Sequence, residues 1–151
     1  MGRGDRLNRV YLDTNVFIYA IGGESPHRDP ARVLLRAVAE GRLAGETSAY
    51  TVQEIVRQRR RRGDAEATTR GREAAALCAV LHPVDRDVAV TALDLVDRHP
   101  GLDVADAVHV STAMTHGLSV LVSADRDLDG IPWIERVDPR DGDRLAALTS
   151  E

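Results

Sequence analysis

Short apolar runs alternate with longer stretches of helical periodicity along this chain. The runs typical of strands cover residues 9–12, 120–122 and 133–137, and a brief edge-like segment covers 82–84. A second short strand is expected within 44–48, although its polar Gly45 and Glu46 make it less typical. Apolar residues at helical spacing predict helices after the first strand and at 29–40, 52–62, 85–98 and 104–116. Strands separated by helices form parallel sheets with right-handed crossovers. We therefore predict an α/β fold, a three-layer α/β/α sandwich with a mainly parallel central sheet.

Two further helices complete the predicted pattern. The polar end of the chain turns into a short helix through residues 145–148. The other helix has Asp64 as its candidate N-cap, and its shared apolar face contains Ala74, Leu77, Cys78 and Leu81.

The composition is that of one ordinary soluble domain spanning residues 1–151. The chain is 43% hydrophobic and contains a single cysteine, so Cys78 cannot form an internal disulfide and is expected to pack as a small apolar residue. A lone cysteine fits a reducing cytoplasm. The apolar run 16–21 is too short for a signal sequence or a membrane span of about 20 residues. We therefore predict a cytoplasmic protein without membrane association.

Positive charge is concentrated in one segment, although the formal net charge is −4. All 20 basic residues are arginines, and the densest group is Arg57 with Arg59–Arg62. Two interpretations stay open at this point. The segment is either a solvated helix end or a surface for nucleic acid or an acidic partner, since arginine binds phosphate and carboxylate through two parallel hydrogen bonds.

Four acidic residues lie at the ends of predicted strands or in the first turns of predicted helices: Asp13, Glu54, Asp106 and Asp125. The carboxyl ends of parallel strands form the usual ligand crevice, so these side chains are expected to face one another. Four gathered anions repel unless a cation is bound. Hard oxygen ligands favour Mg²⁺ or Mn²⁺. The pattern therefore predicts a metal site suited to phosphodiester cleavage.

Each acid also has a structural explanation. Residues 51–54 match a helix capping box and residues 103–106 resemble one, while Asp13 could cap a helix and Asp125 could begin a turn. Capping does not explain why all four acids fall around one crevice. Residues 125–130 match half of an EF-hand loop, but Arg136 occupies the twelfth position and cannot bind calcium. His109 and His116 are expected to have packing or surface roles.

Four segments in order resemble the PIN-domain ribonucleases, and most closely the VapC-type toxins of toxin–antitoxin pairs. They are residues 10–16, 47–54, 102–113 and 121–127, and the resemblance covers about residues 9–138. It implies a PIN-like sandwich with less ordered termini. It also implies a metal-dependent endoribonuclease that leaves 5′-phosphate and 3′-hydroxyl ends, an antitoxin of the VapB type that blocks the crevice, and a homodimer. Leu128 stands where the family often has an aromatic residue, a difference expected to affect packing.

The resemblance also assigns roles to single residues. Asp13, Glu54, Asp106 and Asp125 would be the catalytic and metal-binding acids, with Asp13 and Asp106 the leading direct ligands of Mg²⁺ or Mn²⁺. Thr14, Asn15 and Ser123 would support their geometry. With aromatics at only 3%, RNA affinity must come mainly from arginines and metal, which favours a structured RNA recognised by shape and phosphate position. The candidate contacts with RNA or a partner are Arg57, Arg60, Arg61 and Arg126.

Two other functions remain open from the sequence. One is a PIN nuclease of RNA processing that has no antitoxin. The other is a non-catalytic PIN-like module whose acids survive as helix caps and whose arginines bind a protein.

Overall fold

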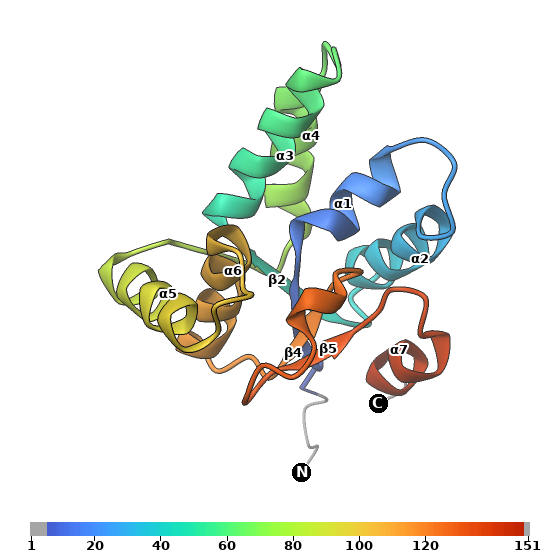
Figure 1. Ribbon diagram of the computed structural model, residues 1–151. Coiled ribbons are helices and arrows are strands. Elements are labelled where there is room, and N and C mark those ends of the chain that lie inside the picture. The colour runs from blue at the N-terminus through green and yellow to red at the C-terminus, as the bar shows by residue number, and fades with distance from the viewer. Residues whose placement is uncertain (1–5, 150–151) are drawn as a thin grey trace.

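The computed structural model describes residues 6–149, which form five strands, seven α-helices and one 3₁₀ turn (Figure 1). The expectation of less ordered termini falls largely outside these residues. In chain order the elements are β1 (Arg9–Leu12), α1 (Thr14–Ile21), α2 (Arg28–Ala39), β2 (Ala44–Ser48), α3 (Ala49–Arg61), α4 (Ala67–Leu77), β3 (Val80–His82), α5 (Arg86–Arg98), α6 (Val104–Thr115), β4 (Val120–Val122), η1 (Arg126–Leu128), β5 (Glu135–Val137) and α7 (Gly142–Thr149).

The five strands form one parallel sheet in the order β3-β2-β1-β4-β5. Helices α1, α2 and α7 lie on one side of the sheet, and α5 and α6 lie on the other (Figure 1). Successive side chains of a strand point to opposite faces. Val10 and Leu12 accordingly enter the core beneath α1 and α2, whereas Tyr11 between them enters the core beneath α5 and α6. The predicted three-layer sandwich is confirmed.

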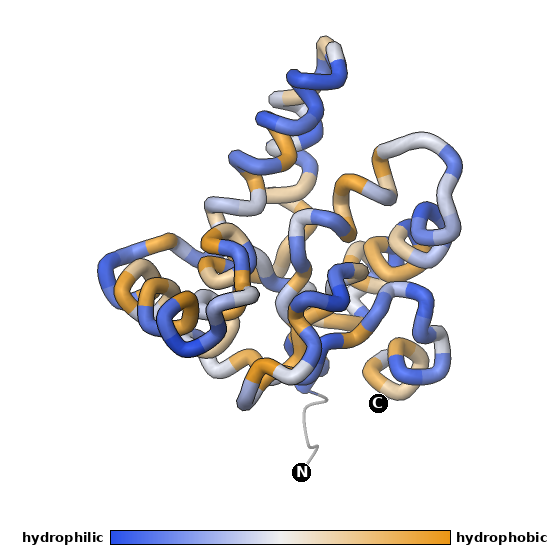
Figure 2. Tube along the Cα trace, in the orientation of Figure 1, coloured by the Kyte–Doolittle hydropathy of each residue, from blue (hydrophilic) through white to orange (hydrophobic). Residues whose placement is uncertain are grey.

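Apolar residues of the helices pack against both faces of the sheet. Figure 2 shows the hydrophobic positions along the chain. Leu34 of α2 and Phe17 of α1 pack in the first core, while Leu95 of α5 and Val110 of α6 pack in the second. Leu128 is fully buried in the second core, which confirms that it acts in packing. Among residues 6–149, no helix is long and apolar enough to cross a membrane.

Strand β2 has an unusual sequence that the structure explains. A Cβ atom at Gly45 would lie 2.7 Å from a methyl group of Val38, so glycine lets α2 approach the sheet closely. Glu46 is buried, yet its carboxylate accepts from Arg9 Nε at 2.6 Å and lies 2.6 Å from His82 Nε2. Buried charges are tolerated when they are paired and hydrogen-bonded in this way.

Helices α3 and α4 pack against each other and project from the body of the molecule (Figure 1). Gly71 permits their close contact, because a Cβ there would lie 2.6 Å from Val56 Cγ2. At the tip, Arg59 Nε donates to Asp64 Oδ2 at 2.8 Å. The connecting turn is therefore held by an ion pair.

The predicted bounds of one helix and of the last strand differ from those in the structure. Leu81 does not lie on the apolar face of α4, because that helix ends at Leu77 and Leu81 belongs to β3, where it is 40% exposed. The last strand begins at Glu135 rather than at Trp133, which is exposed and has a positive φ of 72° that no strand accommodates. Cys78 follows α4 as a free thiol that packs against the first core, as expected.

Candidate active site

The four acids singled out by the sequence line a single pocket of about 350 Å³. It lies at the carboxyl edge of the sheet, where β1 and β4 end and α1, α3 and α6 contribute side chains. The structure therefore brings together Asp13, Glu54, Asp106 and Asp125, as predicted.

Asp13 is the most firmly held of these acids. It directly follows β1 and caps α1, so its Oδ1 accepts from the backbone N–H of Thr14 at 2.7 Å. Its Oδ2 accepts from Ser123 Oγ at 2.7 Å and from Asn15 Nδ2 at 3.1 Å. The capping interpretation and the pocket position are thus both correct for Asp13, and the three expected supporting residues surround it.

Asn15 and Ser123 also join the two sides of the pocket. Asn15 Nδ2 donates to Ser123 Oγ at 2.9 Å, and the amide N–H of Asp125 donates to the same oxygen at 3.0 Å. Asp125 itself begins the η1 turn by accepting from the amide N–H of Asp127 at 2.9 Å. The turn predicted at Asp125 is confirmed, and its carboxylate still lines the pocket.

Glu54 is not part of a capping box. Helix α3 begins earlier than the box requires, because Ser48 is its N-cap and accepts from the amide N–H of Thr51. Glu54 therefore lies in the second turn, where its Oε1 accepts from Thr14 Oγ1 at 2.7 Å and lies 2.6 Å from His109 Nε2. Burial would raise the pKa of Glu54, but the hydrogen bonds from His109 and Thr14 outweigh it and lower the pKa.

Asp106 stands in the first turn of α6, and Asp103 supplies the cap of that helix by accepting from the amide N–H of Ala105 at 2.9 Å. Burial, together with the charges of Asp13 and Asp125, raises the pKa of Asp106 to about 7. The raised pKa shows that the surroundings of Asp106 disfavour its negative charge. A cation bound in the pocket would stabilise that charge.

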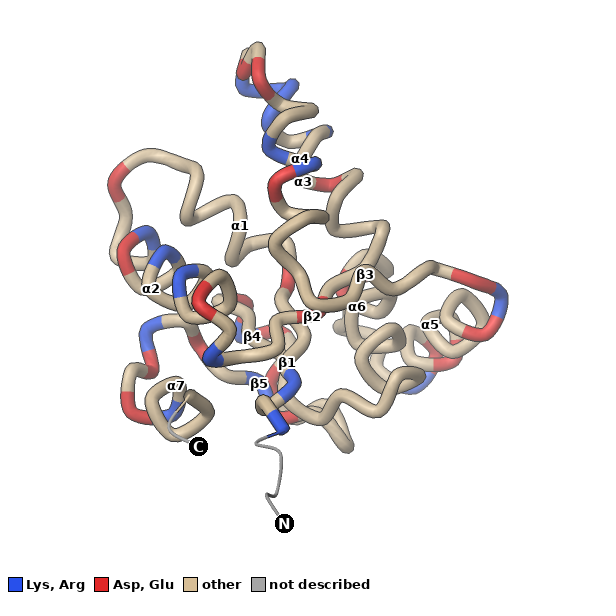
Figure 3. The backbone as a smooth tube through the Cα atoms, turned by 180° about the vertical axis from the view of Figure 1, so that it is seen from behind, with Lys and Arg blue, Asp and Glu red and all other residues tan. Residues whose placement is uncertain are grey.

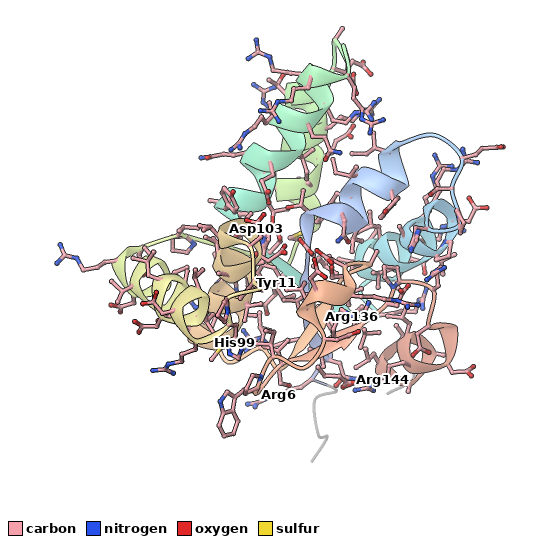
Figure 4. The ribbon with its side chains drawn as sticks, in the orientation of Figure 1. Arg6, Tyr11, His99, Asp103, Arg136 and Arg144 are labelled. Carbon is pink, nitrogen blue, oxygen red and sulfur yellow. The ribbon has the colours of Figure 1, made fainter. Side chains whose placement is uncertain are left out.

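His109 completes the pocket wall, although the sequence analysis gave it only a packing or surface role. Its ring is almost fully buried, and its Nδ1 lies 2.7 Å from the hydroxyl of Tyr11, which Figure 4 shows in the interior below Asp103. Its Nε2 also lies 3.5 Å from Asp13 Oδ1. Burial opposes the charged ring, but the facing oxygens of Tyr11, Glu54 and Asp13 raise the pKa of His109. The spacing from Asp106 could have identified His109 as a pocket residue, because residues three positions apart lie on the same face of a helix.

A protein-family model of the PIN domain matches residues 10–134. The chain belongs to the PIN-domain family. This PIN domain is 40% identical over 118 residues to Ribonuclease VapC7 of Mycobacterium tuberculosis, a match that covers 77% of the chain and 81% of the relative. The resemblance to PIN-domain proteins of the VapC type is therefore confirmed.

Solved structures show the same fold. VapBC2 from Rickettsia felis, bound to a DNA fragment from their promoter, matches with a TM-score of 0.68 and 15% identity, covering 86% of this chain and 98% of that one. A toxin–antitoxin complex from Klebsiella pneumoniae matches with a TM-score of 0.65 and 23% identity, covering 86% and 97%. These matches confirm the PIN-like α/β/α sandwich.

The donor set of this PIN domain fits a hard divalent cation, because the pocket presents carboxylate oxygens and one of the acids has a raised pKa. Within the described part of the chain, however, no three acidic, histidine or cysteine side chains already converge on one metal position. Glu54 and Asp13 are instead engaged by hydrogen bonds from the pocket wall. These bonds determine how the two carboxylates face the pocket.

The densest group of arginines in this PIN domain lies on the basic hairpin, the pair of helices α3 and α4 that projects from the body (Figure 3). The candidate contacts Arg57, Arg60 and Arg61 line a groove of about 500 Å³ on α3, and its apolar floor includes Val52 and Val56. The fourth candidate contact, Arg126, is exposed immediately after Asp125. The sequence analysis did not place Arg62 or Gln58 at the site, yet both line the acidic pocket. The run of basic residues thus reaches the pocket through Arg62.

Proposed function

We propose that this chain is a toxin of the VapC type, a metal-dependent endoribonuclease that hydrolyses RNA phosphodiester bonds and is neutralised by a cognate VapB-type antitoxin. The observation that carries the proposal is the acidic pocket of Asp13, Glu54, Asp106 and Asp125 in a PIN domain 40% identical to Ribonuclease VapC7. The toxin–antitoxin complexes among the structural matches support an antitoxin partner.

The four acids would hold Mg²⁺, with Mn²⁺ able to replace it. When bound, the metal supplies charge stabilisation at the phosphate and lowers the pKa of a water nucleophile. Asp13, fixed by three donors, and Asp106, which has the raised pKa, are the leading direct ligands. Asp125 and Glu54 complete the acidic set. No covalent intermediate with the protein is needed in this reaction.

The basic hairpin would bind the RNA backbone, since arginine contacts phosphate without reading sequence. Arg57, Arg60 and Arg61 on α3 and Arg126 beside the pocket are the proposed contacts, and Arg62 joins them because it lines the pocket itself. A structured RNA in the cytoplasm is the proposed substrate, and the active form is proposed to be a homodimer.

The test is cleavage of total cellular RNA by the purified protein, freed of any partner, with Mg²⁺ or Mn²⁺ and with an EDTA control. We expect discrete fragments with 5′-phosphate and 3′-hydroxyl ends. Asp13→Asn should abolish them, whereas Asp94→Asn, which changes an exposed acid of α5, should not. Metal-independent cleavage, or full activity of Asp13→Asn, would contradict the assignment.

The antitoxin proposal has its own measurement. A cognate antitoxin is expected to be a small protein encoded beside this gene, and its co-expression should yield a stable complex that suppresses cleavage. A free, active nuclease in the presence of that neighbour would favour the RNA-processing alternative. Absence of both metal binding and cleavage would favour the non-catalytic module.

A further inference from the structure

One buried histidine faces the proposed nuclease pocket without belonging to the acidic set. His109 Nε2 lies 2.6 Å from Glu54 Oε1, 3.3 Å from Thr14 Oγ1 and 3.5 Å from Asp13 Oδ1. An ionised carboxylate can only accept hydrogen bonds, so Nε2 carries the hydrogen and donates it to Glu54.

The opposite edge of the ring is anchored to the sheet. The Tyr11 hydroxyl lies 2.7 Å from His109 Nδ1 and donates to Ser48 Oγ at 3.0 Å. Ser48 is the N-cap of α3, the helix that carries Glu54. The rings of Tyr11 and Tyr50 have centroids 5.7 and 5.5 Å from that of His109. The imidazole is therefore fixed by the same elements that deliver the carboxylate.

Glu54 needs such fixing more than Asp13 does. Asp13 directly follows a strand and accepts from a backbone amide and two side chains of the pocket. Glu54 has a longer side chain and is held by side-chain donors, the hydroxyl of Thr14 and the ring of His109. A freely rotating Glu54 would lose conformational freedom each time it bound a metal, which weakens binding.

We propose that His109 is a positioning residue of this site: its Nε2–H, held from behind by Tyr11, fixes the Glu54 carboxylate in the orientation that receives the metal. The inference rests on the proposed function. In metal sites generally, a hydrogen-bond partner orients each metal ligand, and losing that partner lowers metal affinity or activity by about 10–100-fold.

Two substitutions separate positioning from ring charge. Glutamine places an amide donor about as far from the backbone as Nε2, whereas the shorter asparagine reaches only as far as Nδ1. Both His109→Gln and His109→Asn remove the ring and its charge, but only glutamine can still donate to Glu54. We expect His109→Asn to bind Mn²⁺ about 10–100-fold more weakly than His109→Gln, measured by titration calorimetry on metal-free protein. RNA cleavage should show the same ranking in kcat with little change in KM for RNA.

A matched control is present on the same face of the sheet. His82 Nε2 lies 2.6 Å from the buried Glu46, so His82→Asn also removes the donor of a histidine–glutamate pair, one that lies outside the acidic pocket. Its Mn²⁺ affinity should equal that of the unmodified protein even if its Tm falls. A comparable loss of affinity in His82→Asn would show that general destabilisation explains the effect, and would overturn the positioning role.

A double substitution tests whether His109 acts through Glu54. In a Glu54→Gln background, His109→Asn should produce no more than about a twofold further change in Mn²⁺ affinity, because coupled residues are not additive. A full additional loss, or equal behaviour of His109→Asn and His109→Gln, would overturn the inference. If His109→Asn does not fold, Tyr11→Phe replaces it, and unchanged Mn²⁺ affinity in that variant overturns the inference. An unmodified protein that neither binds Mn²⁺ nor cleaves RNA would instead refute the proposed function.

Discussion

Two histidine–glutamate pairs with a buried imidazole ring, both with a nitrogen–oxygen distance of 2.6 Å, occupy different parts of this molecule. In the first, Glu46 is matched by His82 and by Arg9, which donates through Nε and Nη2. In the second, Glu54 and His109 stand beside three further carboxylates and an open pocket. The same side-chain pair is charge-balanced in one place and surrounded by excess acid in the other.

The difference shows that the balance of nearby charge distinguishes a carboxylate that stabilises the fold from one that can bind a cation. Burial would raise the pKa of Glu46, but the hydrogen bonds from Arg9 and His82 outweigh it and lower the pKa, so the Glu46 carboxylate is satisfied within the fold. Among residues 6–149, no arginine forms an ion pair with Asp106 of the acidic pocket, and burial together with neighbouring acids raises its pKa. Unbalanced charge of one sign at a pocket is the feature expected of a cation site.

The largest expected difference between the two regions concerns catalysis. Asp106→Asn should reduce RNA cleavage by more than about 100-fold, because loss of a direct metal ligand costs at least as much as loss of a supporting group. Glu46→Gln should change cleavage by less than about threefold when assayed below its Tm. Single-turnover cleavage of one mapped RNA measures both. Similar losses in the two variants would remove the distinction between the regions.

Stability should show the reverse order. Glu46→Ala leaves His82 and Arg9 without their buried partner, and we expect a loss of about 3 kcal/mol in the free energy of unfolding. Asp106→Asn should not destabilise the metal-free protein at neutral pH. Urea unfolding followed by circular dichroism, with EDTA present, tests the pair of variants. A stable Glu46→Ala protein would show that the first pair contributes little.

The pH dependence gives a smaller effect of predictable sign. Asp106 keeps its proton up to about pH 7 in the folded protein, but only to about pH 4 when unfolded. The folded state therefore binds more protons between these values, and this residue makes stability fall as the pH rises from about 4 to 7.

Asp106→Asn removes this penalty. We expect a gain on the order of 1 kcal/mol at pH 8, equivalent to about 2–4 °C in Tm, and no gain at pH 4. Thermal unfolding in EDTA measures the difference, with the exposed Asp97→Asn of α5 as the control. An equal gain at both pH values would point to a cause other than ionisation.

The smallest expected effect concerns the basic hairpin. Replacing Arg60 and Arg61 by alanine should raise the KM for RNA a few-fold, and should reduce the salt dependence of binding by up to about two phosphate contacts. Mn²⁺ affinity should not change. Arg36→Ala, which removes an exposed arginine on α2, is the control. An unchanged salt dependence would favour the hairpin as a protein-binding surface.

Much of the fold could be predicted from local pattern. The apolar run at 120–122 and the helical periodicity at 104–116 correspond closely to β4 and α6, because strands and helices repeat their apolar positions with different periods. Errors arose at element ends. Leu81, predicted to lie on a helix, belongs to strand β3. The capping box predicted at 51–54 does not form, because Ser48 at the end of β2 caps α3 three residues earlier.

The sequence by itself determined which acids stand at strand and helix ends, and the parallel sheet then brings Asp13, Asp106 and Asp125 to one edge. Only the tertiary structure decided what each carboxylate contacts. His109 and Glu54 are 55 positions apart, and their hydrogen bond exists because β1, α3 and α6 meet around Tyr11. Periodicity identifies the face of an element, whereas the partner across that face depends on how the elements pack together.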